Sequence, residues 1–153
     1  MIGLLRRVIM SKNTEKAKAF FDQGANCCQA VVGTFAEKYG LSVETALRLA
    51  AGMGGGVQSG EICGVVSGGV MVVGLKYGSG TLDAVAKKQC GEKTKEFINI
   101  FCQRQGGITC RNLLGYDLST AEGQRRKREQ PGHAPVCYEL VAASVSLLEE
   151  LGY

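Results

Sequence analysis

Apolar positions recur at intervals of three and four residues along most of the chain, which is the spacing of amphipathic helices. Short turns that contain glycine or proline separate these stretches. The expected helical segments are 11–23 (opening at Ser11 or Thr14), 27–39, 43–50, 61–77, 82–105 (capped by Thr81), 110–114, a basic segment from Ser119 to just before Pro131, and 135–151. In segment 82–105, Gly91 is expected to mark a kink or a break into two helices, and the expected core face is Leu82, Val85, Ala86, Phe97, Ile98 and Phe101. The β-branched residues between positions 65 and 73 lie among glycines without the alternation of a strand. We therefore expect an all-α fold, a single-domain multi-helix bundle with about six to seven helices.

The longest apolar run covers residues 62–75 and is too short for a membrane span, which needs about 20 apolar residues. We interpret it as a buried helix and expect no membrane span. Two arginines interrupt the apolar residues of segment 1–10, and no small-residue cleavage site follows, so this segment does not resemble a secretion signal. The chain of 153 residues is expected to form one domain, residues 11–153, preceded by a flexible N-terminal tail, residues 1–10.

The net charge of +4 is modest and dispersed, so charge alone does not indicate a nucleic-acid partner. One cationic run, Arg125 to Arg128, falls on a predicted surface helix. Such a run is more often a solvated face than the binding site of an anionic partner. No RNA- or DNA-binding motif accompanies it, and we expect no nucleic-acid partner.

Seven cysteines are many for a chain of this size, and the number is odd. Without an export signal, a cytoplasmic location is expected. In that reducing compartment, thiols are more often catalytic or metal-binding than joined in structural disulfides. Composition thus points to cysteine chemistry before any motif is considered.

Four of the cysteines fall in the first turn of a predicted helix: Cys27, Cys63, Cys110 and Cys137. Unpaired backbone N–H groups and the positive end of the helix dipole stabilise a thiolate there and lower the thiol pKa. The thiolate is both the nucleophilic and the metal-binding form of cysteine. If the four helix starts converge, they form a four-sulfur site. No close CxxC pair exists, so spacing adds nothing to this argument.

The other three cysteines, Cys28, Cys90 and Cys102, lie inside predicted helices, and we expect them to fill space in the core. Glu61 lies two residues before Cys63 and is interpreted as a partner of the helix dipole, with proton acceptor as the alternative. His133, the only histidine, precedes Cys137 in a loop and is expected to be exposed, with ligand or base as the alternative.

The glycine cluster at 52–56 follows a helix and lacks the spacing of a phosphate-binding loop. We expect it to form a turn with positive φ that lets the helix of Cys63 pack against a neighbour. The small residues Gly64 and Gly68 are expected to give that close packing.

The segment Cys63-Gly64-Val65-Val66-Ser67-Gly68 resembles the CGAxxG motif of the C_GCAxxG_C_C family of redox-active proteins, a bacterial-type family. Further matches are Asn26 to Val31, Gly54 to Gly56 with Gly60-Glu61, Gly74 to Gly78, Thr109-Cys110 and Val136-Cys137. The four cysteines that define the family correspond to Cys27, Cys63, Cys110 and Cys137. The chain departs from the motif at Val65, where the family has alanine.

This resemblance implies a small helical protein that is redox-active or cluster-binding and is frequently encoded near transporters. A related domain in the split-Soret type of cytochrome suggests iron–sulfur ligation by analogy. The resemblance does not imply a particular substrate or redox partner.

Two functional hypotheses follow, and a third alternative is that the thiols are spread through the core and never meet. In the first, the four cysteines Cys27, Cys63, Cys110 and Cys137 form a redox-active centre, and the protein is an oxidoreductase or an electron carrier. The centre works by thiol–disulfide exchange, with Cys63 as the preferred nucleophile, or by ligation of an iron–sulfur cluster or zinc. In the second, the protein is a non-enzymatic metal-binding or interaction module, such as a transporter accessory. The face of Gly64 and Gly68 would then contact a partner helix or a second subunit in a homo-oligomer.

Overall fold

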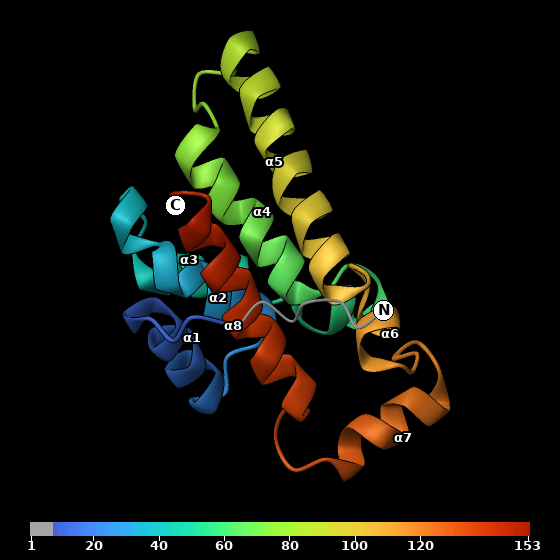
Figure 1. The fold of residues 1–153 in the computed structure, drawn as a ribbon. Coiled ribbons are helices and arrows are strands. Elements are labelled where there is room, and N and C mark those ends of the chain that lie inside the picture. The colour runs from blue at the N-terminus through green and yellow to red at the C-terminus, as the bar shows by residue number, and fades with distance from the viewer. Residues whose placement is uncertain (1–7) are drawn as a thin grey trace.

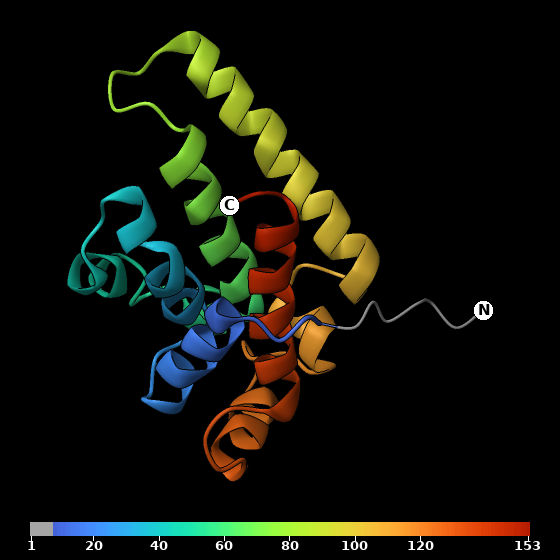
Figure 2. The same ribbon diagram turned by 60° about the vertical axis from the view of Figure 1, so that its left-hand side comes forward.

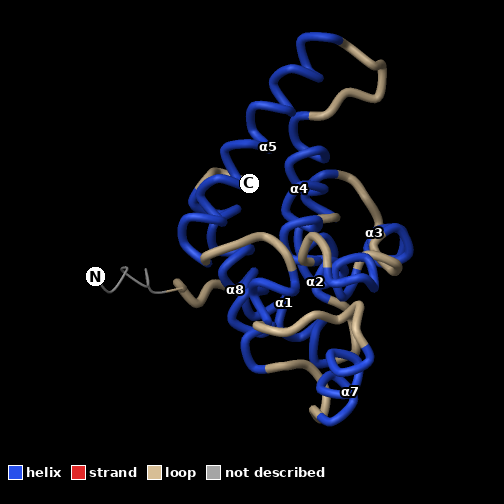
Figure 3. Tube along the Cα trace, turned by 90° about the vertical axis from the view of Figure 1, so that its right-hand side faces the viewer, coloured by secondary structure: helices blue, strands red, loops and turns tan. Residues whose placement is uncertain are grey.

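The structure is a computed structural model that describes residues 8–153. The α-helices are α1 (Lys12–Asp22), α2 (Cys27–Phe35), α3 (Val43–Leu49), α4 (Gly64–Tyr77), α5 (Ala84–Gln105), α6 (Cys110–Leu114), α7 (Ala121–Glu129) and α8 (Pro135–Glu150). Two short helical turns, η1 (Glu37–Tyr39) and η2 (Gly56–Gly60), complete the regular structure. Helices and loops account for the whole described chain in Figure 3, apart from one isolated β-bridge. The all-α prediction is confirmed. Of the predicted N-terminal tail, residues 1–7 lie outside the described residues.

Helix α4 is the centre of the bundle, packing against α2, α5 and α8, while α1 packs against α2 and α8. The largest fully buried side chains include Phe21, Phe35, Phe97 and Phe101. Helices α4 and α5 form a hairpin whose loop projects away from the other helices (Figures 1 and 2). Helices α6 and α7 lie at the opposite end of the molecule, next to the start of α8 (Figure 1). This end of the bundle carries the candidate site.

The helix boundaries follow the expected caps in several places. The side chains of Ser11, Asn26, Ser42 and Thr109 each accept a hydrogen bond from the backbone N–H three residues later. Pro135 occupies the first turn of α8. Helix α7 begins one residue later than its sequence pattern predicts, because Thr120 rather than Ser119 is the N-cap.

Three predictions about α5 are wrong. Its N-cap is Asp83 and not Thr81. Leu82 and Val85, expected in the core, are 91% and 76% exposed, because the hairpin projects beyond the elements that could cover them. Gly91 does not interrupt the helix, which runs unbroken from Ala84 to Gln105. Of the remainder of the predicted face, Phe97 and Phe101 are buried, and Ala86 and Ile98 are partly buried.

Helix α4 begins at Gly64 and not at Glu61. Backbone pairing with the segment before α6 keeps Glu61 and Ile62 out of the helix. Cys63 is consequently the N-cap residue of α4, immediately before its first turn.

Candidate functional site

The thiols of Cys27, Cys63, Cys110 and Cys137 line a single cavity of about 120 Å³. Each lies at or next to the start of a helix: Cys27 and Cys110 are the first residues of α2 and α6, Cys63 caps α4, and Cys137 is the third residue of α8. Cys63 and Cys110 are buried, and the other two are partly buried. The four helix starts therefore meet at one place.

A short piece of antiparallel pairing brings Cys63 and Cys110 together. Ile62 and Thr109 form the bridge; the Cys63 N–H donates to the Ile108 carbonyl, and the Cys110 N–H donates to the Glu61 carbonyl, both at 2.8 Å. In this pattern the residues that follow the paired residues are diagonal neighbours on the same face of the ladder. Both chains then turn directly into helices, with their cysteines at the helix start.

Close contact between α2 and α4 brings Cys27 to the site. A Cβ at Gly64 would lie 2.9 Å from the Cys27 Cβ and 2.9 Å from the Cys28 backbone nitrogen, and a Cβ at Gly68 would lie 2.9 Å from the Val31 Cβ. Such distances are too short for any side chain, so glycine is required at both positions. The predicted packing role of Gly64 and Gly68 is confirmed, and the face they form is covered by α2 of the same chain.

Helix α8 supplies Cys137 and is fixed against α4. The buried Ser144 hydroxyl donates to the Val65 carbonyl at 2.9 Å. Val65, which departs from the CGAxxG motif, is fully buried and accommodated at this contact. The Tyr138 hydroxyl, next to Cys137, donates to the Asp22 carboxylate of α1 at 2.9 Å. These contacts hold the start of α8 at the cavity.

The thiol environment favours ionisation of Cys63. Hydrogen bonding from the Cys110 and Cys27 thiols lowers the pKa of Cys63 to about 4, and the backbone N–H groups of Val65 and Gly64 act in the same direction. Burial opposes this shift but is outweighed. Cys63 is therefore a thiolate at neutral pH, which is the nucleophilic form of cysteine.

The neighbouring thiols complement this charge. Hydrogen bonding to Cys63, together with burial, raises the pKa of Cys110 far above its ordinary value. The pKa of Cys27 is raised chiefly by its hydrogen bond to Cys137 and then by that to Cys63, and the same Cys27 bond lowers the pKa of Cys137. A thiol has one proton to donate, so Cys27 shares it between two acceptors. Cys110, Cys63, Cys27 and Cys137 thus form a series of alternating donors and acceptors.

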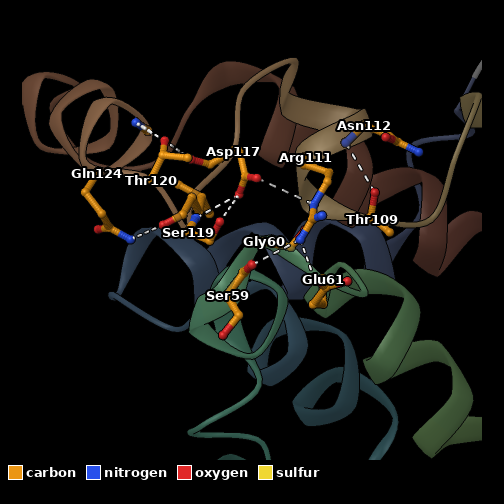
Figure 4. A network of polar contacts seen from close by, with 12 residues as sticks. Ser59, Gly60, Glu61, Thr109, Arg111, Asn112, Asp117, Ser119, Thr120 and Gln124 are labelled. Atoms are coloured by element: carbon orange, nitrogen blue, oxygen red, sulfur yellow. Dashed lines mark hydrogen bonds and ion pairs between the residues drawn. The ribbon is translucent and has the colours of Figure 1, made fainter.

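Glu61 faces a different partner from the one expected. It precedes α4 and is not part of its first turn, and its carboxylate pairs with Arg111 (Figure 4). The Arg111 guanidinium also donates to the Ser59 and Gly60 carbonyls and lies 4.0 Å from the Asp117 carboxylate. Arg111 therefore ties η2 to the start of α6 and to the loop that leads to α7.

The glycine cluster forms the predicted turn with positive φ, and the turn extends further than the glycines. Gly55 and Gly56 have φ values of 64° and 62°, and Val57 and Gln58 follow with 57° each. A β-branched residue in this left-handed region is strained. Gly54, Gly55 and Gln58 line the cavity, so this strained turn forms part of its wall.

His133 also lines the cavity, contrary to the expectation that it is merely exposed. Its ring stacks on Phe21 with a centroid distance of 3.5 Å and an interplanar angle of 10°. Burial lowers the pKa of His133, so the imidazole is neutral at pH 7.

The remaining cysteines separate as two core residues and one surface residue. Cys28 is fully buried, with its sulfur 3.8 Å from the Met71 sulfur, and burial raises its pKa to about 12. Cys90 is partly buried against the core. Cys102 is exposed, so its predicted core role is wrong.

Sequence reasoning did not identify Lys127 as a residue of the site, although it belongs to the cationic run. Arg125 and Arg126 of that run pair with Glu122, and Arg125 also pairs with Glu129, on the surface of α7. Lys127 instead lines the cavity. The charge pattern alone does not distinguish it from its neighbours.

The four cysteines are also candidate ligands of a metal ion or an iron–sulfur cluster. Four thiolates are a donor set that zinc and iron–sulfur clusters use. Within residues 8–153, however, no group of three or more His, Cys, Asp or Glu side chains is arranged to hold a metal ion. Ligation of a metal or cluster by the four cysteines therefore stays a prediction, and no chemical step is assigned to it.

Comparison with known proteins gives a match to a protein family. The family model described as "Putative redox-active protein (C_GCAxxG_C_C)" matches residues 25–151. No curated protein and no solved structure matches the chain. None of the helices in the described part of the chain is long and apolar enough to cross a membrane.

Proposed function

The chain belongs to the C_GCAxxG_C_C family of redox-active proteins, and from this premise we propose that Cys27, Cys63, Cys110 and Cys137 form a thiol–disulfide redox centre. The observation that carries the proposal is the meeting of the four thiols at one cavity, with Cys63 as the ionised member. The family match covers nearly the whole chain and supports redox chemistry in general terms.

Cys63 is the nucleophile in this proposal. Its thiolate attacks one sulfur of a disulfide R–S–S–R, the S–S bond breaks, and a Cys63–S–S–R mixed disulfide forms. The displaced R–S⁻ takes a proton and leaves as a thiol. The buried environment keeps competing water away from the mixed disulfide.

Cys110 is the resolving thiol. Its hydrogen bond is the largest influence on Cys63, and the bridge between Ile62 and Thr109 holds the two backbones together. Cys110 gives up its proton to the first departing R–S⁻ and then attacks the Cys63 sulfur, so that a Cys63–Cys110 disulfide forms and the second R–S⁻ leaves and takes a proton from solvent. Two electrons have then passed from the protein dithiol to the substrate disulfide, and a second dithiol regenerates the centre by the reverse exchange. Cys27 and Cys137 adjust the charge around Cys63 through the shared proton.

The test uses reduced protein purified without oxygen. A visible spectrum with iron, zinc and sulfide analysis comes first, because the cluster and zinc alternatives predict stoichiometric metal. The protein is then mixed with a small disulfide, and the released thiol is measured. We expect metal-free protein that loses two thiols per chain, and no reaction in Cys63→Ser.

Cys102→Ser is the matched control, because Cys102 is exposed and is not among the residues that line the cavity. It is expected to react as the wild type does. Stoichiometric iron and sulfide, stoichiometric zinc, or unchanged reactivity in Cys63→Ser would overturn the exchange mechanism.

A further inference from the structure

The reactive thiols are accessible only to small reactants. Cys63 and Cys110 are 3% and 4% exposed, and both face a cavity of about 120 Å³. A thiolate must approach the sulfur it attacks directly, so access decides which disulfides react. A bulky disulfide on a folded protein surface is disfavoured at such a buried site.

One cation lies at this cavity. Lys127 lines it from α7, and its nitrogen lies 3.9 Å from where a Cβ on Gly55 would be. No aspartate or glutamate is among the described residues that line the cavity. Lys127 itself has no ion pair within residues 8–153, whereas the adjacent Arg125 and Arg126 are paired with glutamates of their own helix.

The charge of Lys127 is felt inside the cavity. It contributes, after larger effects, to lowering the pKa of both Cys137 and His133. Asn26, Gln58 and Gln130, which carry amide side chains, also line the cavity, together with the apolar residues Leu113 and Leu118. The cavity therefore offers one positive charge and neutral hydrogen-bonding groups next to an apolar surface.

We propose that the cavity binds a small disulfide carrying a carboxylate, and that Lys127 binds this carboxylate while Cys63 attacks the sulfur. The inference rests on the proposed thiol–disulfide function and names its substrate class. An unpaired lysine at the mouth of a cavity without acidic groups favours an anionic ligand over a neutral or cationic one. The apolar wall accommodates the methylene groups that join the sulfur to the carboxylate.

Lys127 could instead act only by stabilising the thiolates, and the two roles predict different rates with charged and neutral disulfides. If the lysine only stabilised the thiolates, its removal would slow reaction with every disulfide alike. If it binds the substrate carboxylate, its removal slows only the anionic disulfides. The charge of the substrate therefore separates the two roles.

The experiment measures second-order rate constants for thiol release with 3,3′-dithiodipropionate, bis(2-hydroxyethyl) disulfide and cystamine, which are anionic, neutral and cationic. Each rate is divided by that of free cysteine with the same disulfide, which corrects for intrinsic reactivity. We expect the wild type to prefer the anionic compound. Lys127→Gln should slow the anionic reaction about three- to tenfold, as expected for one partly exposed ion pair, and leave the neutral reaction unchanged.

Arg128→Gln is the matched control, because Arg128 is an exposed cation on the same helix and does not line the cavity. It should leave all three rates unchanged. Lys127→Glu should shift the preference towards cystamine. Equal slowing of all three reactions by Lys127→Gln, or no slowing at all, would overturn the inference while leaving the role of Cys63 intact. Failure of wild-type protein to react with any of the three would instead contradict the proposed function itself.

Discussion

Ile62 pairs with Thr109 in an antiparallel bridge, and the cysteine that follows each of them, Cys63 or Cys110, lines the same cavity. The pairing extends over only a few residues, with one backbone hydrogen bond on each side of the bridge. It ends because both chains enter helices at once, α4 after Cys63 and α6 at Cys110. Two segments distant in sequence thus present their thiols to each other through backbone geometry alone.

This relationship predicts the first disulfide of the oxidised protein. Limited oxidation followed by peptide mapping should give a Cys63–Cys110 crosslink, because Cys110 is the strongest hydrogen-bond partner of Cys63. In Cys110→Ser, the mixed disulfide on Cys63 should persist longer, since its resolving thiol is gone. A Cys27–Cys63 crosslink as the main product would assign the resolving role to Cys27 instead.

The depressed pKa of Cys63 predicts a pH-dependent stability. Between about pH 4 and the ordinary thiol value of 9.0, the folded protein holds Cys63 as thiolate while the unfolded chain binds a proton. The free energy of unfolding should therefore rise with pH across this window, and the contribution should be lost as pH falls through the folded pKa. Cys27 and Cys110, whose pKa values are raised, contribute in the opposite direction only above the ordinary value.

Urea unfolding between pH 5.5 and 8 measures this effect. The wild type should show a steeper rise than Cys63→Ser, with a difference in slope of up to about one proton. Cys28→Ser provides the control, because its thiol is protonated over this range in both folded and unfolded states. Identical slopes for the wild type and Cys63→Ser would contradict the ionised state of Cys63.

The contact of α4 with α2 predicts opposite effects for two glycine substitutions in one helix. Gly64→Ala places a methyl group 2.9 Å from the Cys27 Cβ, and this overpacking should destabilise the protein by about 1–3 kcal/mol. Gly74→Ala meets no atom within 4 Å, and the better helix propensity of alanine should stabilise it by about 1 kcal/mol. Chemical denaturation of both variants checks the prediction.

The rate of disulfide reduction shows whether Gly64→Ala changes the four-cysteine site in addition to lowering the stability of the protein. Gly64→Ala should also slow disulfide reduction under conditions in which the variant remains folded. The added methyl group pushes α2 away from α4 and so moves Cys27 away from Cys63. Gly74→Ala should react as the wild type does. A stable Gly64→Ala variant with unchanged reactivity would show that the close approach of α2 is not needed at the site.

The helices and their capping residues could be predicted because they depend on local pattern. Asn26 and Thr109 each cap the helix that starts with a site cysteine, and their side chains fit that role in any fold. Placement at helix starts also selected the four thiols that line the cavity. In these places the relevant interactions lie within a few residues of one another.

The features that sequence could not supply depend on contacts between distant segments. Glu61 was expected in a helical turn, but its carbonyl pairs with the Cys110 N–H, which keeps it outside the helix, and its carboxylate pairs with Arg111. Leu82 was expected in the core, but the hairpin of α4 and α5 carries it beyond the other helices. Lys127 belongs to the site only because the chain between α6 and α8 brings one cation of a surface run to the cavity.

The ionisation of Cys63 within the four-thiol series is the central claim, and the pH dependence of its alkylation tests that claim most directly. Reduced, metal-free protein is treated with iodoacetamide from pH 4 to pH 10, and the modification of each cysteine is followed by peptide mass spectrometry, with exposed Cys102 as the internal reference. The account predicts that Cys63 has a reactivity midpoint well below neutral pH, so that its rate is the same at pH 6 and pH 8. A midpoint for Cys63 near the ordinary thiol value of 9.0 would contradict it.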